Sequence, residues 1–164
     1  MLYRVSKTVG IPRVYVDASV YGGAFDTEFA GPTLAFLERV RAGQFRLVVS
    51  SIVQDEILEA PARVLSLFEE LRQDAETVDV TEAAVALQKA YLRACVVGPS
   101  ADVDALHVAL ATVSGCQLIV SWNFRHIVNF RRIPLYNGVN LANGFGPLGI
   151  HAPQEVVWDE DETV

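Results

Sequence analysis

Cysteines, long apolar runs and basic residues are all scarce in this sequence. Its two cysteines, Cys95 and Cys116, lie in apolar surroundings without the spacing of a metal site, so we expect reduced, buried thiols and neither a disulfide framework nor structural zinc. No apolar run reaches the roughly 18 residues of a membrane span, and Met1–Pro12 lacks the features of a secretion signal. These absences predict a cytoplasmic protein that is neither exported nor inserted into a membrane.

Acidic residues outnumber basic residues by 20 to 13, which gives a net charge of −7. Four of the acids form the run Asp159–Glu162, and we expect residues 159–164 to be a solvated, disordered tail. The total charge therefore does not exclude a nucleic-acid partner for the rest of the chain. Four basic residues within eight positions could form a positive rim beside an acidic pocket, or a plain solvated surface: Arg125, His126, Arg131 and Arg132.

The rest of the composition fits one domain with a substantial core. Hydrophobic residues make up 51% of the 164 residues, and the mean hydropathy is +0.28, which provides ample apolar surface for a core. No repeat, low-complexity stretch or linker rich in proline and serine divides the sequence. We therefore expect a single domain over residues 1–158.

Short apolar runs alternate with amphipathic segments, a pattern typical of an α/β fold. Three runs rich in β-branched residues predict buried strands, and two further segments predict weaker ones: Arg13–Asp17, Arg46–Ser50 and Gln117–Ser121, then Thr77–Val80 and Gly149–His151. Apolar residues recur at helical spacing in 32–41 and 81–97, with Thr81 as N-cap and Gly98-Pro99 as the stop. Further helices are expected from Ser100 and Pro153.

Three acidic residues lie where apolar elements end or turn. Asp17 closes the first strand, Glu56 lies about a turn and a half into the helix after the second, and Asp104 lies in the first turn of a later helix. Parallel strands gather their carboxyl ends at one edge of a sheet, where such folds bind ligands. Two carboxylates about 4 Å apart repel by roughly 4 kcal/mol at an effective dielectric near 20, so the trio needs a cation. Oxygen ligands favour Mg²⁺ or Mn²⁺ over zinc.

Each of these acids has a simpler structural explanation. Asp17 could cap the following helix by accepting backbone N–H groups. Asp55 competes with Glu56, since a helix separates consecutive residues by about 100° and only one of them can face the pocket. Asp102 competes with Asp104 because both stabilise a helix N-terminus.

For two further residues near the predicted site, we expect an ordinary structural role. His107, one turn after Asp104, is expected to be a hydrogen-bonded helix histidine and not a metal ligand. Trp122 could stack on a base, but core packing is the favoured interpretation for an aromatic residue that follows a strand.

The ordered motifs of the chain resemble those of the PIN-domain nuclease superfamily, and within it the VapC-type toxins of type II toxin-antitoxin systems. The matching segments are Val14–Val20, Ser50–Ile57 and Asp104–Ala111, and the resemblance covers about residues 13 to 157. It implies a three-layer PIN-like domain with a central parallel sheet of four or five strands flanked by helices. It further implies a Mg²⁺ or Mn²⁺ site, RNA as substrate, an antitoxin protein as partner and a homodimer.

The resemblance also assigns roles to residues of this chain. Asp17, Glu56 and Asp104 are expected to hold the metal. PIN nucleases often carry a fourth acid after the strand that matches Gln117–Ser121, where this chain has Asn123. The side-chain carbonyl of Asn123 could complete the metal shell with a lower affinity for the cation. Substrate contacts are expected from three residues: Ser19, Ser121 and Arg125.

The favoured hypothesis is therefore a metal-dependent endoribonuclease, the toxin of a toxin-antitoxin pair. Asn123 leaves open an inactive PIN-like module that binds RNA or protein without cutting. A phosphatase of the haloacid dehalogenase type also places an aspartate after the first strand. That class usually has a second acid two positions later and a downstream lysine, whereas this chain has Ser19 there and Lys89 inside an amphipathic helix.

Overall fold

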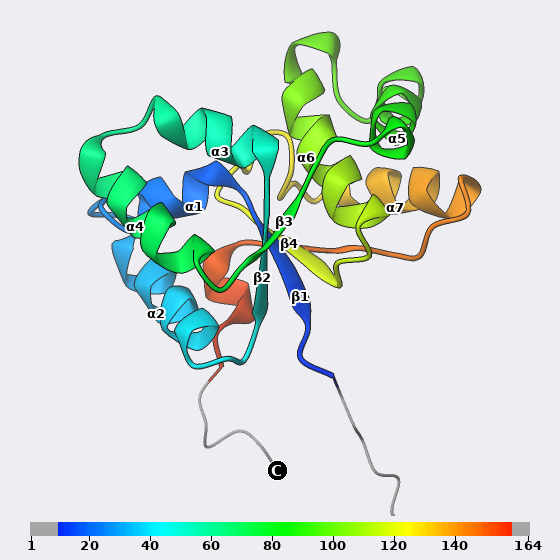
Figure 1. The fold of residues 1–164 in the computed structure, drawn as a ribbon. Coiled ribbons are helices and arrows are strands. Elements are labelled where there is room, and N and C mark those ends of the chain that lie inside the picture. The colour runs from blue at the N-terminus through cyan, green and yellow to red at the C-terminus, as the bar shows by residue number, and fades with distance from the viewer. Residues whose placement is uncertain (1–9, 159–164) are drawn as a thin grey trace, which may run out of the picture.

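The computed structural model describes residues 10–158, so the predicted acidic tail lies outside the described residues. Five parallel strands form one sheet in the order β3-β2-β1-β4-β5 (Figure 1). Their bounds are β1 Arg13–Val16, β2 Arg46–Ser50, β3 Glu76–Val78, β4 Leu118–Val120 and β5 Gly149–His151. The predicted α/β class and parallel sheet are confirmed.

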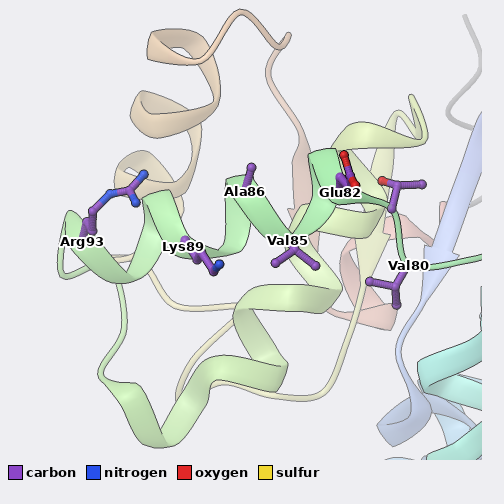
Figure 2. Close-up of a pocket in the computed structure, with 7 residues that line it drawn as sticks. Val80, Glu82, Val85, Ala86, Lys89 and Arg93 are labelled. Atoms are coloured by element: carbon purple, nitrogen blue, oxygen red, sulfur yellow. The ribbon is translucent and has the colours of Figure 1, made fainter.

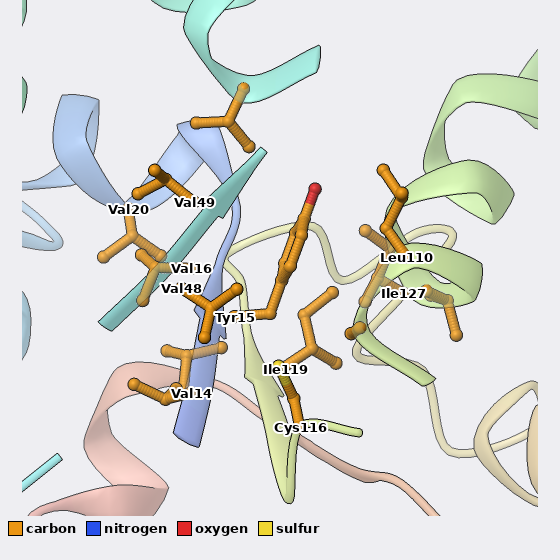
Figure 3. Close-up of a cluster of buried hydrophobic side chains, with 14 of the residues drawn as sticks. Val14, Tyr15, Val16, Val20, Val48, Val49, Leu110, Cys116, Ile119 and Ile127 are labelled. Carbon is orange, nitrogen blue, oxygen red and sulfur yellow. The ribbon is translucent and has the colours of Figure 1, made fainter. Parts of the chain in front are cut away.

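The central strand β1 is buried on both faces, which explains its uninterrupted apolar sequence. Val14, Tyr15 and Val16 are each 0% exposed, as expected for a strand with a parallel neighbour on each side and helices on both faces. Val14 pairs with Leu47 of β2 and with Leu118 of β4. Figure 3 shows the Tyr15 ring among apolar side chains, with its hydroxyl oxygen directed away from them toward the end of β2.

Helices cover both faces of the sheet and give three layers (Figure 1). One side carries four helices: α1 Ala18–Gly23, α2 Ala30–Arg41, α3 Ser51–Leu58 and α4 Ala62–Arg72. The other side carries three: α5 Glu82–Arg93, α6 Asp102–Val113 and α7 Ile133–Ala142. Two short 3₁₀ helices, η1 Pro99–Ala101 and η2 Pro153–Val156, precede α6 and follow β5.

The strand order reverses at β1, the central strand of the sheet. From β1 the chain first builds β2 and β3 on one side, then crosses over to build β4 and β5 on the other. Parallel sheets bind ligands where the strand order reverses in this way. The backbone N–H of Asp17 donates to the carbonyl of Val120 at 3.1 Å, which joins the ends of β1 and β4 at this point.

The predicted helix over 81–97 begins as expected but ends earlier. The Thr81 hydroxyl accepts a hydrogen bond from the Ala84 N–H at 3.1 Å, which confirms the predicted N-cap. The helix ends at Arg93, and Cys95 has a φ of 57°, in the left-handed region that terminates helices. Both cysteines are free; Cys116 is buried as predicted, but Cys95 is exposed, so the prediction of a buried thiol there is wrong.

The helix expected from Ser100 starts as η1 and becomes α-helical at Asp102. Within residues 10–158, no helix combines the length and the apolar character that a membrane crossing requires. The cytoplasmic location stays a prediction from the sequence.

Candidate metal centre

Asp17 directly follows β1 and is almost fully buried, with 6% of its surface exposed. It takes the N-cap position of α1, yet its side chain makes no capping hydrogen bond. Instead Oδ2 accepts hydrogen bonds from the hydroxyls of Ser19 and Ser121, each at 2.8 Å. Helix capping therefore does not account for this carboxylate.

The same two serines also hold the loop that follows β4. The Ser19 hydroxyl oxygen accepts from the Trp122 N–H at 3.0 Å, and that of Ser121 accepts from the Asn123 N–H at 2.9 Å. Each hydroxyl thus donates one hydrogen bond to Asp17 and accepts one from the loop backbone. The remaining lone pair of each oxygen can accept only from a donor such as water. Ser19 is half-buried, whereas Ser121 is fully buried, so the predicted substrate contact is sterically open to Ser19 alone.

Glu56 and His107 meet beside Asp17, although they come from opposite sides of the sheet. The Nε2 atom of His107 lies 2.5 Å from Oε1 of Glu56 and 3.8 Å from Oδ1 of Asp17. The His107 side chain is 1% exposed, whereas that of Glu56 is 38% exposed. On its other side, His107 Nδ1 lies 2.7 Å from the Tyr15 hydroxyl.

Asp104 lies one turn before His107 on α6 and is half-buried. Burial raises the pKa of its carboxyl group, and the charge of Asp17 raises it further. A hydrogen bond from the Asn123 side chain and the two nearby histidines act in the opposite direction without cancelling the rise in pKa. Asp104 is therefore close enough to Asp17 for the two negative charges to interact.

Asn123 links Asp104 to the loop after β4. A carboxylate can only accept, so the Asn123 amide nitrogen donates to Asp104. The amide oxygen accepts from the His126 N–H at 2.9 Å. The oxygen that the sequence predicts as a metal ligand is therefore engaged with the backbone.

Neither competing acid belongs to the group of candidate ligands formed by Asp17, Glu56 and His107. Asp55, next to Glu56, is exposed. Asp102 is exposed, and its carboxylate accepts from the Val103 N–H at 2.9 Å. Of the first pair, Glu56 is the acid that lies with Asp17 and His107. Asp104 is not among these three candidate ligands, and the charge of Asp17 that acts on its carboxyl group is what links it to them.

His107 carries a pKa that is raised despite its burial. Burial alone would lower the pKa of the imidazole, since it penalises the charged form. The hydrogen bond to Glu56 and the charges of the three surrounding carboxylates outweigh this effect and raise the pKa. The raised pKa of the imidazole therefore indicates that its surroundings are strongly negative.

The donor set fits a divalent cation. Asp17, Glu56 and His107 each offer one ligand atom, and these atoms all lie within 4.8 Å of one another. Among the described residues, the ion pairs formed by arginine involve other carboxylates: Glu38, Glu69, Glu70 and Glu76. The carboxylates of the cluster therefore lack positive compensation other than His107, which a cation would provide.

The sequence interpretation did not include His107 in the site. Its spacing of three residues from Asp104 was the available signal, because residues three apart share a helix face. The apolar residues around it favoured the other interpretation, since a buried histidine on an apolar helix is ordinarily a hydrogen-bonded core residue.

The basic rim is only partly available for binding. Arg125 and Arg131 are exposed. Arg132 is half-buried, and its guanidinium donates to the carbonyls of Arg125 at 2.9 Å and Val96 at 2.5 Å. Arg132 thus holds the loop to the segment that follows α5. Of the two exposed arginines, Arg125 is the one closer in sequence to Asn123.

Trp122 packs within the domain, as its favoured interpretation predicts. Its indole N–H donates to the Thr33 hydroxyl at 2.8 Å, and its ring lies 4.3 Å from that of Phe29 between centroids. On its other side the ring contacts Phe124 at 5.8 Å, and Phe124 is 45% exposed. Phe124 is therefore the most exposed of these three rings, since Phe29 and Trp122 are only partly exposed.

A separate hollow of about 500 Å³ runs along α5, lined by Val80, Thr81, Glu82, Val85, Ala86, Lys89 and Arg93 (Figure 2). It shares no residue with the acid cluster. The side chains that contact Asp17 are those of Ser19, Ser121 and His107. The geometry therefore gives no support to a phosphatase that needs a lysine beside its nucleophilic aspartate.

Comparison with solved structures identifies the fold. The chain is similar to one in the crystal structure of VapBC2 from Rickettsia felis bound to a DNA fragment from their promoter, with a TM-score of 0.54 and 16% sequence identity. The match covers 90% of this chain and 99% of that chain. The sequence matches no protein-family model and no curated protein. The PIN-like fold implied by the motifs is confirmed, at the level of architecture.

Proposed function

We propose that this protein is a metal-dependent endoribonuclease that hydrolyses RNA phosphodiester bonds, and the toxin of a toxin-antitoxin pair. The observation that carries the proposal is the buried carboxylate of Asp17, held within coordinating distance of Glu56 and His107 at the reversal of strand order. Asp104 adds a further negative charge beside this group. Acids gathered around a buried carboxylate in this way, without arginine or lysine partners, are characteristic of cation sites.

Asp17, Glu56 and Asp104 would hold Mg²⁺ or Mn²⁺, directly or through water, with Asn123 as a further oxygen donor. When bound, the cation would stabilise the negative charge that develops on a phosphodiester and favour ionisation of the attacking water. Arg125, which is exposed, would contact the RNA backbone. Ser19, which is half-buried, would orient a water molecule through its remaining lone pair. Ser121, which is fully buried, would act by holding Asp17.

Purified protein incubated with total RNA, with and without Mn²⁺, tests the activity. We expect cleavage that needs the cation, that a chelator abolishes and that Asp17→Asn removes without unfolding the protein. Asp55→Asn, which changes an exposed acid next to Glu56, is the matched control and should cut at the wild-type rate. Cleavage that persists in the chelator or in Asp17→Asn would reject the mechanism.

Asn123 supports a second candidate, a PIN-like module that binds RNA or protein without cutting. Its amide replaces the fourth acid of many PIN nucleases, and its oxygen already accepts from the His126 N–H. Calorimetry with Mn²⁺ separates the two candidates, because a scaffold that has lost catalysis has no reason to retain a cation site. Specific Mn²⁺ binding favours the nuclease, and its absence favours the module.

An antitoxin is the proposed protein partner, by analogy with the VapBC2 complex. Large apolar side chains on the surface are consistent with a partner or a second copy of the chain: Ile11, Leu58, Phe130 and Leu141 are 62%, 68%, 93% and 61% exposed. Co-purification with the product of a neighbouring gene tests for the antitoxin, and light scattering tests for the homodimer.

A further inference from the structure

A chain of hydrogen bonds runs from the backbone of α3 through the sheet to the Glu56 carboxylate. The Val53 N–H donates to the Ser50 hydroxyl oxygen at 3.2 Å, and Ser50 lies 2.7 Å from the Tyr15 hydroxyl. Tyr15 in turn lies 2.7 Å from His107 Nδ1, and His107 Nε2 lies 2.5 Å from Glu56 Oε1. Four polar side chains from β1, β2, α3 and α6 are thereby connected.

The inner part of this chain is fixed by burial. Ser50 and Tyr15 are 0% exposed, and His107 is 1% exposed. A buried polar group that loses its partner has no water to replace it, so each of these groups is held where its neighbour requires. Tyr15 is also fixed by its place on the central strand, where its ring packs among apolar side chains (Figure 3).

The chain has a defined direction at its outer end. An ionised carboxylate only accepts hydrogen bonds, so Nε2 of His107 donates to Glu56 whether the imidazole is neutral or charged. In the neutral imidazole Nδ1 is then an acceptor, which the Tyr15 hydroxyl satisfies. A nitrogen that carries a proton toward Glu56 has no lone pair for a metal.

Glu56 needs such a partner more than Asp17 does. Asp17 is short, buried and held by two serine hydroxyls. Glu56 has a longer side chain that is 38% exposed, and a free glutamate at a helix surface samples several rotamers. The contact with His107 selects the rotamer that faces Asp17.

We propose that His107 is a positioning residue, which Tyr15 and Ser50 hold in place so that its Nε2–H fixes the Glu56 carboxylate beside Asp17. This inference rests on the proposed function, because Glu56 is taken there as part of the cation site. It assigns His107 to the support of an acidic ligand and not to the metal itself. Partners that orient a metal ligand typically contribute 10- to 100-fold to affinity or activity.

Substitutions at the two ends of the imidazole separate positioning from packing. His107→Asn keeps a polar atom near Tyr15 but cannot reach Glu56, and it should lower kcat by about 10- to 100-fold and weaken Mn²⁺ binding, with KM for RNA little changed. His107→Gln retains an N–H that reaches Glu56 and should recover most of the loss. Tyr15→Phe should lower kcat several-fold, because the imidazole loses the bond at Nδ1.

Tyr91→Phe is the matched control for Tyr15→Phe. It also removes a buried tyrosine hydroxyl, because Tyr91 lies on α5 and its hydroxyl donates to the side chain of Asn140. This change should destabilise the protein without changing kcat. Equal cleavage by wild type and His107→Asn would overturn the proposal. Pulsed electron paramagnetic resonance of bound Mn²⁺ should detect no directly coordinated nitrogen; a nitrogen coupling lost in His107→Gln would make His107 a ligand and overturn it as well.

A double-mutant cycle keeps the proposal testable if the protein neither cuts RNA nor binds Mn²⁺. In metal-free protein, the effects of His107→Asn and Glu56→Gln on the unfolding midpoint should be non-additive, because both remove the same contact. Additive effects would overturn the positioning role. Absence of both cleavage and Mn²⁺ binding by wild type, with coupling intact, would instead reject the proposed function alone.

Discussion

The hydroxyl of Ser121 donates to Oδ2 of Asp17 across 2.8 Å and joins the residues that directly follow the adjacent strands β4 and β1. Ser121 is fully buried, and its oxygen also accepts from the Asn123 N–H. One side chain therefore orients the central carboxylate and fixes the loop that carries Asn123.

Replacing this serine should affect both stability and the cation site. Ser121→Ala leaves the part-buried Asn123 N–H and the buried Asp17 carboxylate each without one hydrogen-bond partner, and it should cost about 1–3 kcal/mol of unfolding free energy. It should also weaken Mn²⁺ binding by about 10- to 100-fold, measured by calorimetry. Ser114→Ala is the control: that serine bonds to the Leu110 carbonyl within α6, so its loss should leave Mn²⁺ affinity unchanged. Equal affinities for wild type and Ser121→Ala would contradict this account.

Asp104 should destabilise the metal-free protein at neutral pH. Burial raises its pKa, which means that folding disfavours the ionised carboxylate present at that pH. Asp104→Asn removes the charge and should raise the thermal midpoint of the metal-free protein. Mn²⁺ should stabilise wild type by about 2.7 kcal/mol at 100 times its Kd, and the variant by less.

Asp102→Asn provides the comparison, since Asp102 is exposed two positions earlier on the same helix. It should not raise the midpoint, because it removes a charge that favours a helix N-terminus. A midpoint for Asp104→Asn below that of Asp102→Asn would disprove the electrostatic explanation.

Two consecutive glycines of α1 should respond oppositely to alanine. A Cβ at Gly23 would lie 2.7 Å from Nε1 and 2.8 Å from Cδ1 of Trp122, whereas a Cβ at Gly22 meets nothing within 4 Å. Gly22→Ala should stabilise the helix by up to about 1 kcal/mol. Gly23→Ala should cost about 1–3 kcal/mol, since the indole must leave its place. Urea unfolding measures both, and equal effects would show that Trp122 is not packed against α1 as described.

Arg125 should account for part of the salt dependence of RNA binding. Each phosphate contact with a single strand contributes about 0.7 to the slope of log K against log salt. Arg125→Ala should lower the slope by that amount, as measured by fluorescence anisotropy with a single-stranded RNA. Arg46→Ala removes an exposed arginine at the start of β2, at the opposite edge of the sheet, and should leave the slope unchanged. An unaltered slope for Arg125→Ala would exclude it from the RNA contact.

Cys116 should make stability depend on pH in the alkaline range. Burial raises the pKa of its thiol above the ordinary value of 9.0. The folded protein then retains a proton that the unfolded chain releases, so the thiol's contribution is complete below about pH 9 and is lost as the pH rises above it. Urea unfolding from about pH 8 to about pH 9.5 should show a steeper decline in wild type than in Cys116→Ala. Parallel curves would refute the raised pKa.

Much of the fold could be predicted because local pattern decides it. The β-branched run at 46–50 forms β2 with the predicted bounds, and Thr81 caps its helix, since burial and capping act over a few residues. The end of α5 was missed. Val96 and Val97 continue the apolar pattern, but Cys95 turns the chain into the left-handed region first.

The sequence by itself determined which carboxylates could meet, because an aspartate that ends a buried parallel strand must lie at the carboxyl edge of the sheet. Only the tertiary structure decided what surrounds them. His107 and Tyr15 are 92 residues apart in the chain, and the sequence does not show that these two side chains meet or that His107 reaches Glu56. Local patterns specify faces and ends of elements, whereas the partner of a buried polar group depends on which elements the fold packs together.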